Sequence, residues 1–426
     1  MRTPVERAIL VGTPRDRQGV RDGAEHLAEL ARLTDTAGGL VAGELVQRLD
    51  SPKPRYYLGK GKAGELAELV RDREADLVIF DDELTPAQCK NLEALCGVRV
   101  MDRAELILDI FATRARTYEA RLQVELAQLQ YLLPRLRRMW IHLSRIRGGI
   151  GFRGPGETQL ETDRRLIGTR IAELRRKLKG VARAQATRRK RREGRFRAAL
   201  VGYTNAGKSS VLQALSGTDQ FIEDRLFATL DASTRLVPLD NGHEALVTDT
   251  VGFIRKLPHH LIASFRSTLE EAREADVLLH VIDASHPDRD AQRAVVRSVL
   301  EDLGIRKRPR IVVFNKIDLL SGDELLALRK RVAAPGARTA LFTSALKPST
   351  LEPLKSELQD RSRARLRKVS VEMPAGDGRA LAALYEEGEV LSRSQDGTTV
   401  TVIAQASPAL IGRLRARGGV RITECG

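Results

Sequence analysis

Short apolar runs alternate with amphipathic stretches through the first 115 residues of the chain. Beginning with a strand, the pattern predicts alternating strands and helices at Ala8–Val11, Ala24–Thr34, Leu40–Leu49, Lys62–Arg73, Asp76–Phe80, Pro86–Leu95, Val98–Met101 and Arg103–Thr113. Thr85 can cap the helix that begins at Pro86. Such alternation is typical of a parallel sheet, so residues 1–115 are predicted to form a small α/β domain.

Apolar residues then recur at steps of four and three, from Leu122 to Leu143 and again from Ile167 to Val181. This spacing places one narrow apolar stripe on a helix. The stretch between them, residues 148–159, is too rich in glycine to be helical. Residues 116–195 are therefore predicted to form an antiparallel helical hairpin with a Gly-rich tip loop, and Pro134 should interrupt and kink its first helix.

Two further patterns complete the chain. Strands expected at Phe196–Val201, Ala245–Val247, Val277–Ile282, Ile311–Phe314 and Ala340–Thr343, with helices between them, predict a larger α/β domain over residues 196–365. Residues 366–426 read as strand, helix, two strands, helix and strand, with a hairpin turn at Asp396-Gly397. That order predicts a small α+β module of the ferredoxin-like type.

The charge of the chain is concentrated in the hairpin. Residues 121–197 hold 22 Lys and Arg against 6 Asp and Glu, which equals the whole net charge of +16 and leaves the rest of the chain balanced. A solvated basic linker would explain the excess, but runs such as Arg188–Arg192 favour a surface that binds a polyanion, most simply RNA. Aromatic residues are scarce in the segment, which favours contacts with backbone and shape over base stacking.

Composition excludes several classes of protein. The three cysteines form no C-x-x-C pair, which argues against a disulfide scaffold or a cysteine zinc site. No apolar run approaches the ~18 residues that a membrane span requires. A cytoplasmic protein with no stable membrane insertion is expected, with peripheral membrane association left open, and a monomer is the simplest state.

A phosphate-binding loop follows the first strand of the larger domain. Residues 202–209 read GYTNAGKS, which fits G-x-x-x-x-G-K-[ST] between a strand and a helix. Backbone N–H groups of such a loop surround phosphates at a helix N-terminus. Lys208 would reach the β- and γ-phosphates, and the Ser209 hydroxyl would bind Mg²⁺.

Three more motifs follow in the order that a GTPase requires. Asp249-Thr-Val-Gly252 ends a strand, with Asp249 placed to hold Mg²⁺ through water and Gly252 to donate its N–H to the γ-phosphate. In Asn315-Lys316-Ile317-Asp318, the Asp318 carboxylate can accept two hydrogen bonds from guanine, and adenine lacks that donor pair. Ser344-Ala345-Leu346 can read guanine O6 through a backbone N–H.

Thr229 lies in FATLDAST, between the phosphate loop and Asp249. Its hydroxyl could complete the Mg²⁺ shell as part of a mobile switch. The predicted catalytic residues are Lys208, Thr229 and Gly252, and the predicted metal ligands are Ser209 and Thr229. The predicted nucleotide-binding residues are Gly202, Tyr203, Thr204, Asn205, Ala206, Gly207, Lys208, Ser209, Ser210, Phe227, Ala228, Thr229, Asp249, Thr250, Val251, Gly252, Asn315, Lys316, Asp318, Ser344, Ala345 and Leu346.

These motifs together resemble the HflX family of bacterial ribosome-associated GTPases. The resemblance extends outside the nucleotide-binding motifs to YYLGKGK at residues 56–62 and GGIGFRGPGETQLETDRR at residues 148–165, and it covers about residues 5–365. It implies GTP hydrolysis with Mg²⁺, stimulated by the large ribosomal subunit. It also implies splitting of stalled or idle ribosomes under stress, with the basic hairpin approaching ribosomal RNA.

Two other functions stay open on the sequence alone. One is a GTPase associated with RNA modification, although no Cys or acid–base constellation for that chemistry lies outside the larger domain. The other is an ATP-dependent RNA remodeller that uses the N-terminal domain. GKGK at residues 59–62 lacks the spacing of a phosphate loop, which argues against it.

Two residues bear on how hydrolysis is triggered. Ras-like enzymes carry a water-orienting glutamine after D-x-x-G, but here Phe253 follows Gly252 and cannot hydrogen-bond to water. Slow hydrolysis by the free protein is therefore expected. Asn205 stands at a phosphate-loop position where K⁺ is often bound between the β- and γ-phosphates, so K⁺ is a candidate second cation.

Overall fold

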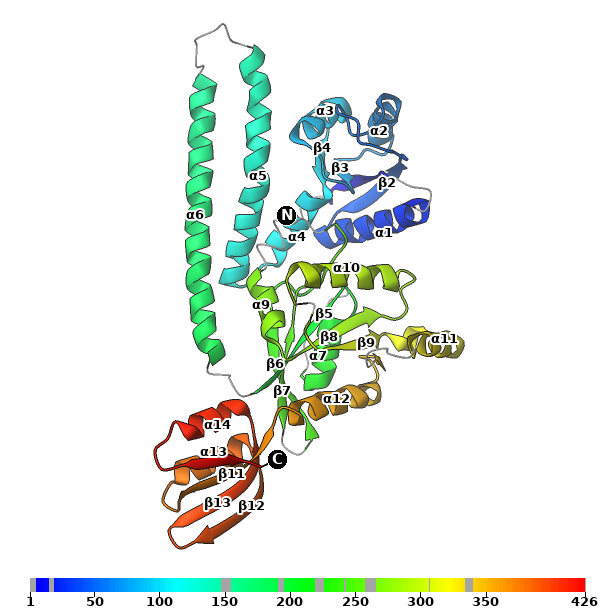
Figure 1. Cartoon of the computed structure of the whole chain (residues 1–426). Coiled ribbons are helices and arrows are strands. Elements are labelled where there is room, and N and C mark those ends of the chain that lie inside the picture. The colour runs from blue at the N-terminus through cyan, green and yellow to red at the C-terminus, as the bar shows by residue number, and fades with distance from the viewer. Residues whose placement is uncertain are drawn as a thin grey trace. The chain divides into compact units, whose positions relative to one another are not determined.

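The computed structural model describes residues 5–14, 19–146, 155–190, 195–218, 226–240, 243–256, 266–305, 307–333 and 340–425 (Figure 1). The chain forms two compact units. The first comprises Met1–Val181 together with Glu223–Asp231 and Val251–Thr268, and the second comprises Ala182–Ile222, Ala232–Thr250 and Leu269–Gly426. Two short segments of the nucleotide-binding half of the sequence therefore belong to the N-terminal unit.

The first unit contains the predicted parallel α/β domain. Its strands are β1 (Arg7–Gly12), β2 (Leu40–Val46), β3 (Leu77–Phe80) and β4 (Arg99–Asp102), and its helices are α1 (Gly19–Ala37), α2 (Lys60–Asp72), α3 (Pro86–Cys96) and α4 (Arg103–Arg114). All strand pairs are parallel, in the order β2-β1-β3-β4. Thr85 caps α3 through a complete capping box with Gln88, as the sequence indicated.

The helical hairpin consists of α5 (Tyr118–Ile146) and α6 (Pro155–Lys190), which lie side by side (Figure 1). Their apolar stripes meet in a cluster of buried and half-buried residues, namely Leu122, Leu126, Leu129, Leu133, Ile167, Ile171, Leu174 and Leu178. The antiparallel pairing predicted from the steps of four and three is thus confirmed for these positions. The residues 147–154 at the tip, with Arg147 and Arg153, and Arg191–Arg192 of the basic run lie outside the described residues.

Two local predictions for the hairpin were wrong. Helix α6 begins at Pro155, so residues 155–159 of the Gly-rich stretch are helical. Proline fits the first position of a helix because the N–H that it lacks has no partner there. Helix α5 also continues through Pro134, so the predicted interruption is absent, and the predicted kink stays a prediction. A proline removes one hydrogen bond, and the turns on either side keep theirs.

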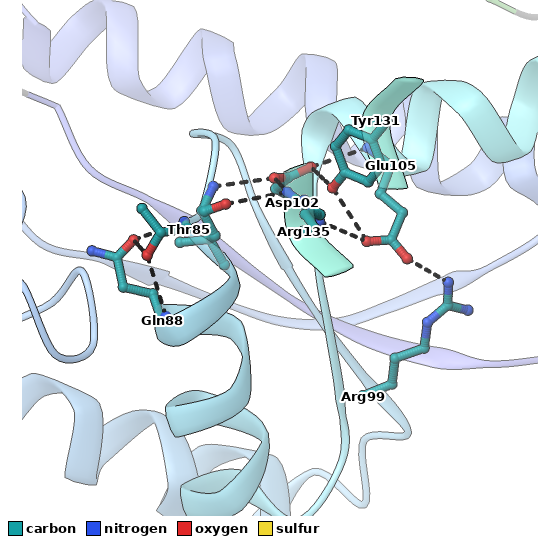
Figure 2. Close-up of polar contacts among 8 residues, drawn as sticks. Thr85, Gln88, Arg99, Asp102, Glu105, Tyr131 and Arg135 are labelled. Carbon is teal, nitrogen blue, oxygen red and sulfur yellow. Dashed lines mark hydrogen bonds and ion pairs between the residues drawn. The ribbon is translucent and has the colours of Figure 1, made fainter. Parts of the chain in front are cut away.

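The first helix of the hairpin is joined to the α/β domain, near the middle of α5, by a network around Asp102 (Figure 2). Asp102 caps α4 by accepting from the Glu105 N–H, and it also accepts from the Tyr131 hydroxyl at 2.8 Å. Arg135, one turn further along α5, forms an ion pair with Asp102 and lies 3.7 Å above the Tyr131 ring. Arg99 extends the network through Glu105 at 2.8 Å. Because Asp102 is fully buried, losing either the Arg135 guanidinium or the Tyr131 hydroxyl would leave a buried carboxylate partly unsatisfied.

The second unit is built on a six-stranded sheet in the order β10-β9-β8-β5-β7-β6. The strands are β5 (Phe196–Gly202), β6 (Ser233–Pro238), β7 (Glu244–Asp249), β8 (Val277–Asp283), β9 (Arg310–Asn315) and β10 (Ala340–Phe342). The connecting helices are α7 (Lys208–Ser216), α9 (Arg266–Glu274), α10 (Arg289–Asp302), α11 (Gly322–Val332) and α12 (Glu352–Arg363). The five predicted strands are present, and β6 is an antiparallel edge strand that the apolar pattern did not reveal.

The C-terminal part of the second unit has the predicted order of elements. It runs through β11 (Arg367–Pro374), α13 (Gly378–Glu387), β12 (Glu389–Asp396), β13 (Thr399–Ala406), α14 (Pro408–Arg415) and β14 (Arg421–Glu424). The sheet is antiparallel, in the order β12-β13-β11-β14. This βαββαβ arrangement fits the expected ferredoxin-like module. Among the helices of the described residues, none is both long enough and apolar enough to cross a membrane.

Candidate nucleotide-binding site

The phosphate loop connects β5 to α7, and two of its glycines have no room for a side chain. A Cβ on Gly202 would come within 2.3 Å of the Val281 carbonyl oxygen. Gly207 has φ 87°, a left-handed conformation, and a Cβ there would lie 2.3 Å from Asn315 Nδ2. The loop is therefore held close to β8 and to the start of the Asn315 motif. The close approach of neighbouring atoms therefore explains why both positions of the motif are glycine.

Lys208 begins α7 with its side chain buried. Its ammonium donates to the carbonyl oxygen of Tyr203 at 3.0 Å, within its own loop. Burial lowers the pKa of Lys208 to about 8, against the raising effect of the Asp249 carboxylate. A buried ammonium with so few anionic neighbours is suited to receive phosphate oxygens.

Ser209 and Asp249 lie together, as the motifs predicted. Ser209 Oγ donates to Asp249 Oδ2 at 2.6 Å, and Asp249 is 2% exposed at the end of β7. Next to Asp249, the Thr250 hydroxyl donates to the Leu200 carbonyl, which fastens the end of β7 to β5. One hydroxyl and one carboxylate, both oxygen donors, form a pair that fits Mg²⁺, which prefers oxygen ligands and keeps several waters.

Asn315 joins three of the predicted loops. Its Nδ2 donates to the Ala206 carbonyl of the phosphate loop at 3.0 Å, and its Oδ1 accepts from the Ala345 N–H at 3.2 Å. Ser344 is fully buried, and its N–H donates to Thr350 Oγ1 at 2.8 Å. Asp318 lies half-buried in the short 3-10 helix that follows Lys316. The structure thus brings the phosphate loop, the Asn315 loop and the Ser344 loop together within the second unit.

The segment with Phe227, Ala228 and Thr229 belongs to the first unit. Phe227 is buried and packs edge-to-face on Phe111 of α4, with ring centroids 4.7 Å apart. Nearby, the Thr117 hydroxyl donates to Asp231 Oδ1 at 2.5 Å. The Phe227 side chain is therefore part of an apolar contact within the N-terminal unit.

The segment that follows Asp249 is also held by the N-terminal domain. Phe253 is buried, in line with a packing role. Lys256 has φ 52° and places its ammonium 2.5 Å from Asp81 Oδ2 and 2.7 Å from Asp82 Oδ1, just beyond the carboxyl end of β3. Burial lowers the pKa of Lys256, but the two carboxylates outweigh it and the pKa is raised. His259 and His260 lie outside the described residues.

Sequence reasoning missed Lys256, Asp81 and Asp82. A signal was available, because ligands of parallel sheets gather where the strand order reverses, and here that point lies between β1 and β3. Asp81 and Asp82 follow β3 directly. Asp81 also pairs with the buried Arg103 at 2.7 Å, so one of its oxygens is used inside the domain and the other receives Lys256.

Three family models cover most of the chain. The N-terminal region of GTP-binding GTPases matches residues 24–112, the middle region of the same proteins matches residues 114–192, and a 50S ribosome-binding GTPase model matches residues 197–316. A GTPase HflX from Caldanaerobacter subterraneus subsp. tengcongensis is 46% identical over 415 residues, which cover 96% of this chain and 93% of that protein. The chain belongs to the HflX family of GTPases. The resemblance drawn from the motifs is confirmed.

A second HflX protein agrees with this assignment. The GTPase HflX of Escherichia coli K12 is 42% identical over 367 residues, which cover 85% of each chain. A crystal structure of SsGBP in complex with GDP covers 84% of this chain and 99% of its own, at 25% identity and a TM-score of 0.46. As a member of the HflX family with a phosphate-loop GTPase fold, the chain binds guanine nucleotides and hydrolyses GTP.

Proposed function

We propose that this HflX protein is a ribosome-associated GTPase that binds the large ribosomal subunit and splits stalled or idle ribosomes under stress. Support comes from the 50S ribosome-binding GTPase model, which matches residues 197–316, and from the basic hairpin that precedes it. In this proposal the phosphate-loop domain, residues 196–365, binds and hydrolyses GTP, and the hairpin contacts ribosomal RNA. The nucleotide cycle then controls how long the protein stays on the subunit.

The hairpin supplies the observation that carries the proposal. Along α6, the apolar stripe of Ile171 and Leu174 is buried against α5, and basic residues remain exposed. The exposed basic residues are Arg164, Arg165, Arg175, Arg176, Lys179 and Arg183. Among the described residues of the chain, none of these six pairs with a carboxylate. By contrast, Arg170 pairs with Glu125 at 2.7 Å. Unpaired cations along one helix suit a row of RNA phosphates.

The residue roles in GTP hydrolysis follow from the same motifs. Lys208 is assigned to the β- and γ-phosphates, and Gly252 donates its N–H to the γ-phosphate. Ser209 and Thr229 would hold Mg²⁺, with Asp249 bound to it through water. When bound, Mg²⁺ neutralises charge on the phosphate oxygens. Asp318 recognises guanine, and Asn315 keeps the base loop in place against the phosphate loop.

A second cation is proposed at Asn205. This residue has φ 60°, a left-handed conformation that asparagine tolerates better than most residues. Its amide would help to hold K⁺ between the β- and γ-phosphates, where the ion would take the place of an arginine finger.

Subunit binding is tested by co-sedimentation with purified large and small subunits, with GDP and with a non-hydrolysable GTP analogue. We expect binding to the large subunit that is stronger with the analogue. The logarithm of affinity should fall as salt rises, and each lost RNA phosphate contact should reduce that slope by ~0.7–0.9 log units per decade of salt. Changing Arg175, Arg176, Lys179 and Arg183 to Gln should lower affinity and flatten that slope.

A matched control removes the same charge elsewhere. Arg297, Arg331, Arg413 and Arg415 each pair with a carboxylate in the second unit, and changing all four to Gln should leave the salt slope as in the parent. Equal binding and slope in parent and hairpin variant would show that the hairpin is not the RNA contact. Splitting is measured separately, as the fall in light-scattering intensity of 70S ribosomes after addition of protein and GTP.

A further inference from the structure

Asp283 is the last residue of the buried strand β8, and no nucleotide-binding motif includes it. Its side chain is 11% exposed. One carboxylate oxygen, Oδ1, accepts from the Ser285 N–H at 3.0 Å and from the Ser285 hydroxyl at 2.6 Å. These two bonds fix the orientation of the carboxylate and leave Oδ2 pointing elsewhere.

The second oxygen is used by the lysine of the base-reading motif. Lys316 Nζ lies 2.8 Å from Asp283 Oδ2. The strands beneath are also joined, because Asp283 pairs with Asn315 in the sheet and the Ala284 N–H donates to the Asn315 carbonyl at 2.8 Å. Burial raises the pKa of Asp283, but the hydrogen bonds from Lys316 and Ser285 outweigh it and lower the pKa, so the carboxylate is ionised at neutral pH.

Lys316 needs such an anchor because of its backbone. Its φ is 62°, in the left-handed region that side-chain-bearing residues seldom adopt. The stem of Lys316 also lies over the phosphate loop, with Cε 4.0 Å from where a Cβ on Gly207 would stand. The side chain therefore runs from the base-reading loop, past the phosphate loop, to the end of β8.

We propose that Asp283 is a positioning residue of the guanine site, which holds the Lys316 ammonium and thereby fixes the Asn315–Asp318 loop against the phosphate loop before nucleotide binds. The proposal rests on the assignment of Asn315, Lys316 and Asp318 to guanine. Asn315 ties the two loops through Ala206, and the Asp283–Lys316 pair separately fixes the Asn315–Asp318 loop to the end of β8, with the Lys316 stem against the phosphate loop. A preset loop binds nucleotide without first paying for its ordering.

The test is the release rate of fluorescent GDP from the full-length protein, followed by stopped flow. Asp283→Asn keeps the shape of the side chain and removes the charge. Loss of a charge-assisted hydrogen bond should speed release of GDP roughly tenfold. The KM for GTP should rise by a similar factor while kcat at saturating GTP is unchanged, because the residue acts on binding. Asp283→Glu should restore part of the parent behaviour.

A double-mutant cycle shows whether Asp283 acts through Lys316. Lys316→Ala should speed release by itself, and adding Asp283→Asn to it should change release little further. Asp290→Asn removes the same charge from an exposed pair with Arg331 and should release GDP as the parent does. The proposal is overturned if the two changes multiply each other's effect on the GDP release rate in the double variant. It is also overturned if Asp283→Asn releases GDP at the parental rate. Parental release from Lys316→Ala would instead overturn the guanine-site assignment, and with it this proposal.

Discussion

Lys208 combines burial with a free-state pKa of about 8, which couples nucleotide binding to protons. Bound phosphates would raise the pKa of Lys208 again, so binding takes up a proton once the free lysine is deprotonated. Affinity for GDP should be constant below about pH 7 and fall as pH rises above 8, by roughly tenfold near pH 9. Titrations with fluorescent GDP at fixed Mg²⁺ measure this directly.

The control for this prediction is Lys208→Met. It should bind GDP weakly at every pH and lose the fall above pH 8, since no titrating ammonium remains. If the parent shows the same affinity at pH 7 and near pH 9, Lys208 is not the group that meets the phosphates in its protonated form.

The two glycines that flank α7 allow the cost of a left-handed backbone conformation to be measured apart from the cost of a steric clash. Gly207 and Gly217 both have left-handed φ, at 87° and 67°, but a Cβ would collide with Asn315 only at Gly207. Gly217→Ala should cost about 1 kcal/mol in the free energy of unfolding, and Gly207→Ala should cost more because it also displaces the buried Asn315. Only Gly207→Ala should also lose GDP binding, because the clash displaces Asn315 from the phosphate loop. Thermal unfolding and GDP titration of the two variants measure both effects, and equal GDP binding would contradict the close approach.

At the residue scale, the contacts between the short motifs could be predicted from the sequence. Ser209 and Asp249 meet as expected, and so do the loops of Ala206, Asn315 and Ala345. It did not reveal Asp283, which lies outside any motif, or Lys256, whose partners are distant in the chain. Lys256 lies 175 residues from Asp81, and its role depends on where β3 ends in the folded domain.

At the element scale, periodicity predicted the strands and helices with strong apolar patterns. Edge strand β6 was missed because its burial is partial, with only Val237 fully buried, so it presents no continuous apolar run. The early start of α6 was missed because Gly, Pro and Gly in residues 154–156 read as a loop. Proline at the first helical position is nevertheless favourable, and the tertiary pairing of the two stripes supports the helix beyond it.

The ion pairs of Lys256 with Asp81 and Asp82, which follow β3, should hold the segment after Gly252 in place. Lys256→Met should remove the cation shared by Asp81 and Asp82, and it should destabilise the first unit by roughly 1–2 kcal/mol because Arg103 still satisfies Asp81. Amide hydrogen exchange of residues 253–256 should become faster. Lys62→Met, which breaks an exposed pair with Glu65 in the same unit, should change neither quantity measurably. Unchanged exchange in Lys256→Met would mean that the buried Phe253 alone holds the segment.

At the scale of the whole molecule, the order of the parts could be predicted because each has its own pattern. Parallel alternation, steps of four and three, a phosphate-loop domain and a βαββαβ module follow one another along the chain. What could not be predicted is that segments 223–231 and 251–268, on either side of Asp249, group with the N-terminal unit. Their attachment depends on contacts between residues far apart in the chain, such as Phe227 with Phe111, Thr117 with Asp231 and Lys256 with Asp81, which no local pattern encodes.

That attachment bears on how hydrolysis is triggered. Phe253 stands where a water-orienting side chain would act, and it is buried, so no side chain at this position can align the attacking water. We therefore expect low turnover by the free protein and strong stimulation by large subunits, which would order the Thr229 segment and place the water. A weaker preference for K⁺ over Na⁺ is expected through Asn205.

Steady-state GTP hydrolysis with and without large subunits, in KCl and in NaCl, tests both parts. Asn205→Ala should lose the K⁺ preference and retain stimulation by subunits, because the cation and the ribosome act on different parts of the transition state. Each effect has its own source: K⁺ would compensate charge on the phosphates, and the subunit would supply the missing alignment of water. Fast turnover by the free protein in NaCl would contradict the whole account, whereas equal rates in the two salts would remove only K⁺ from it.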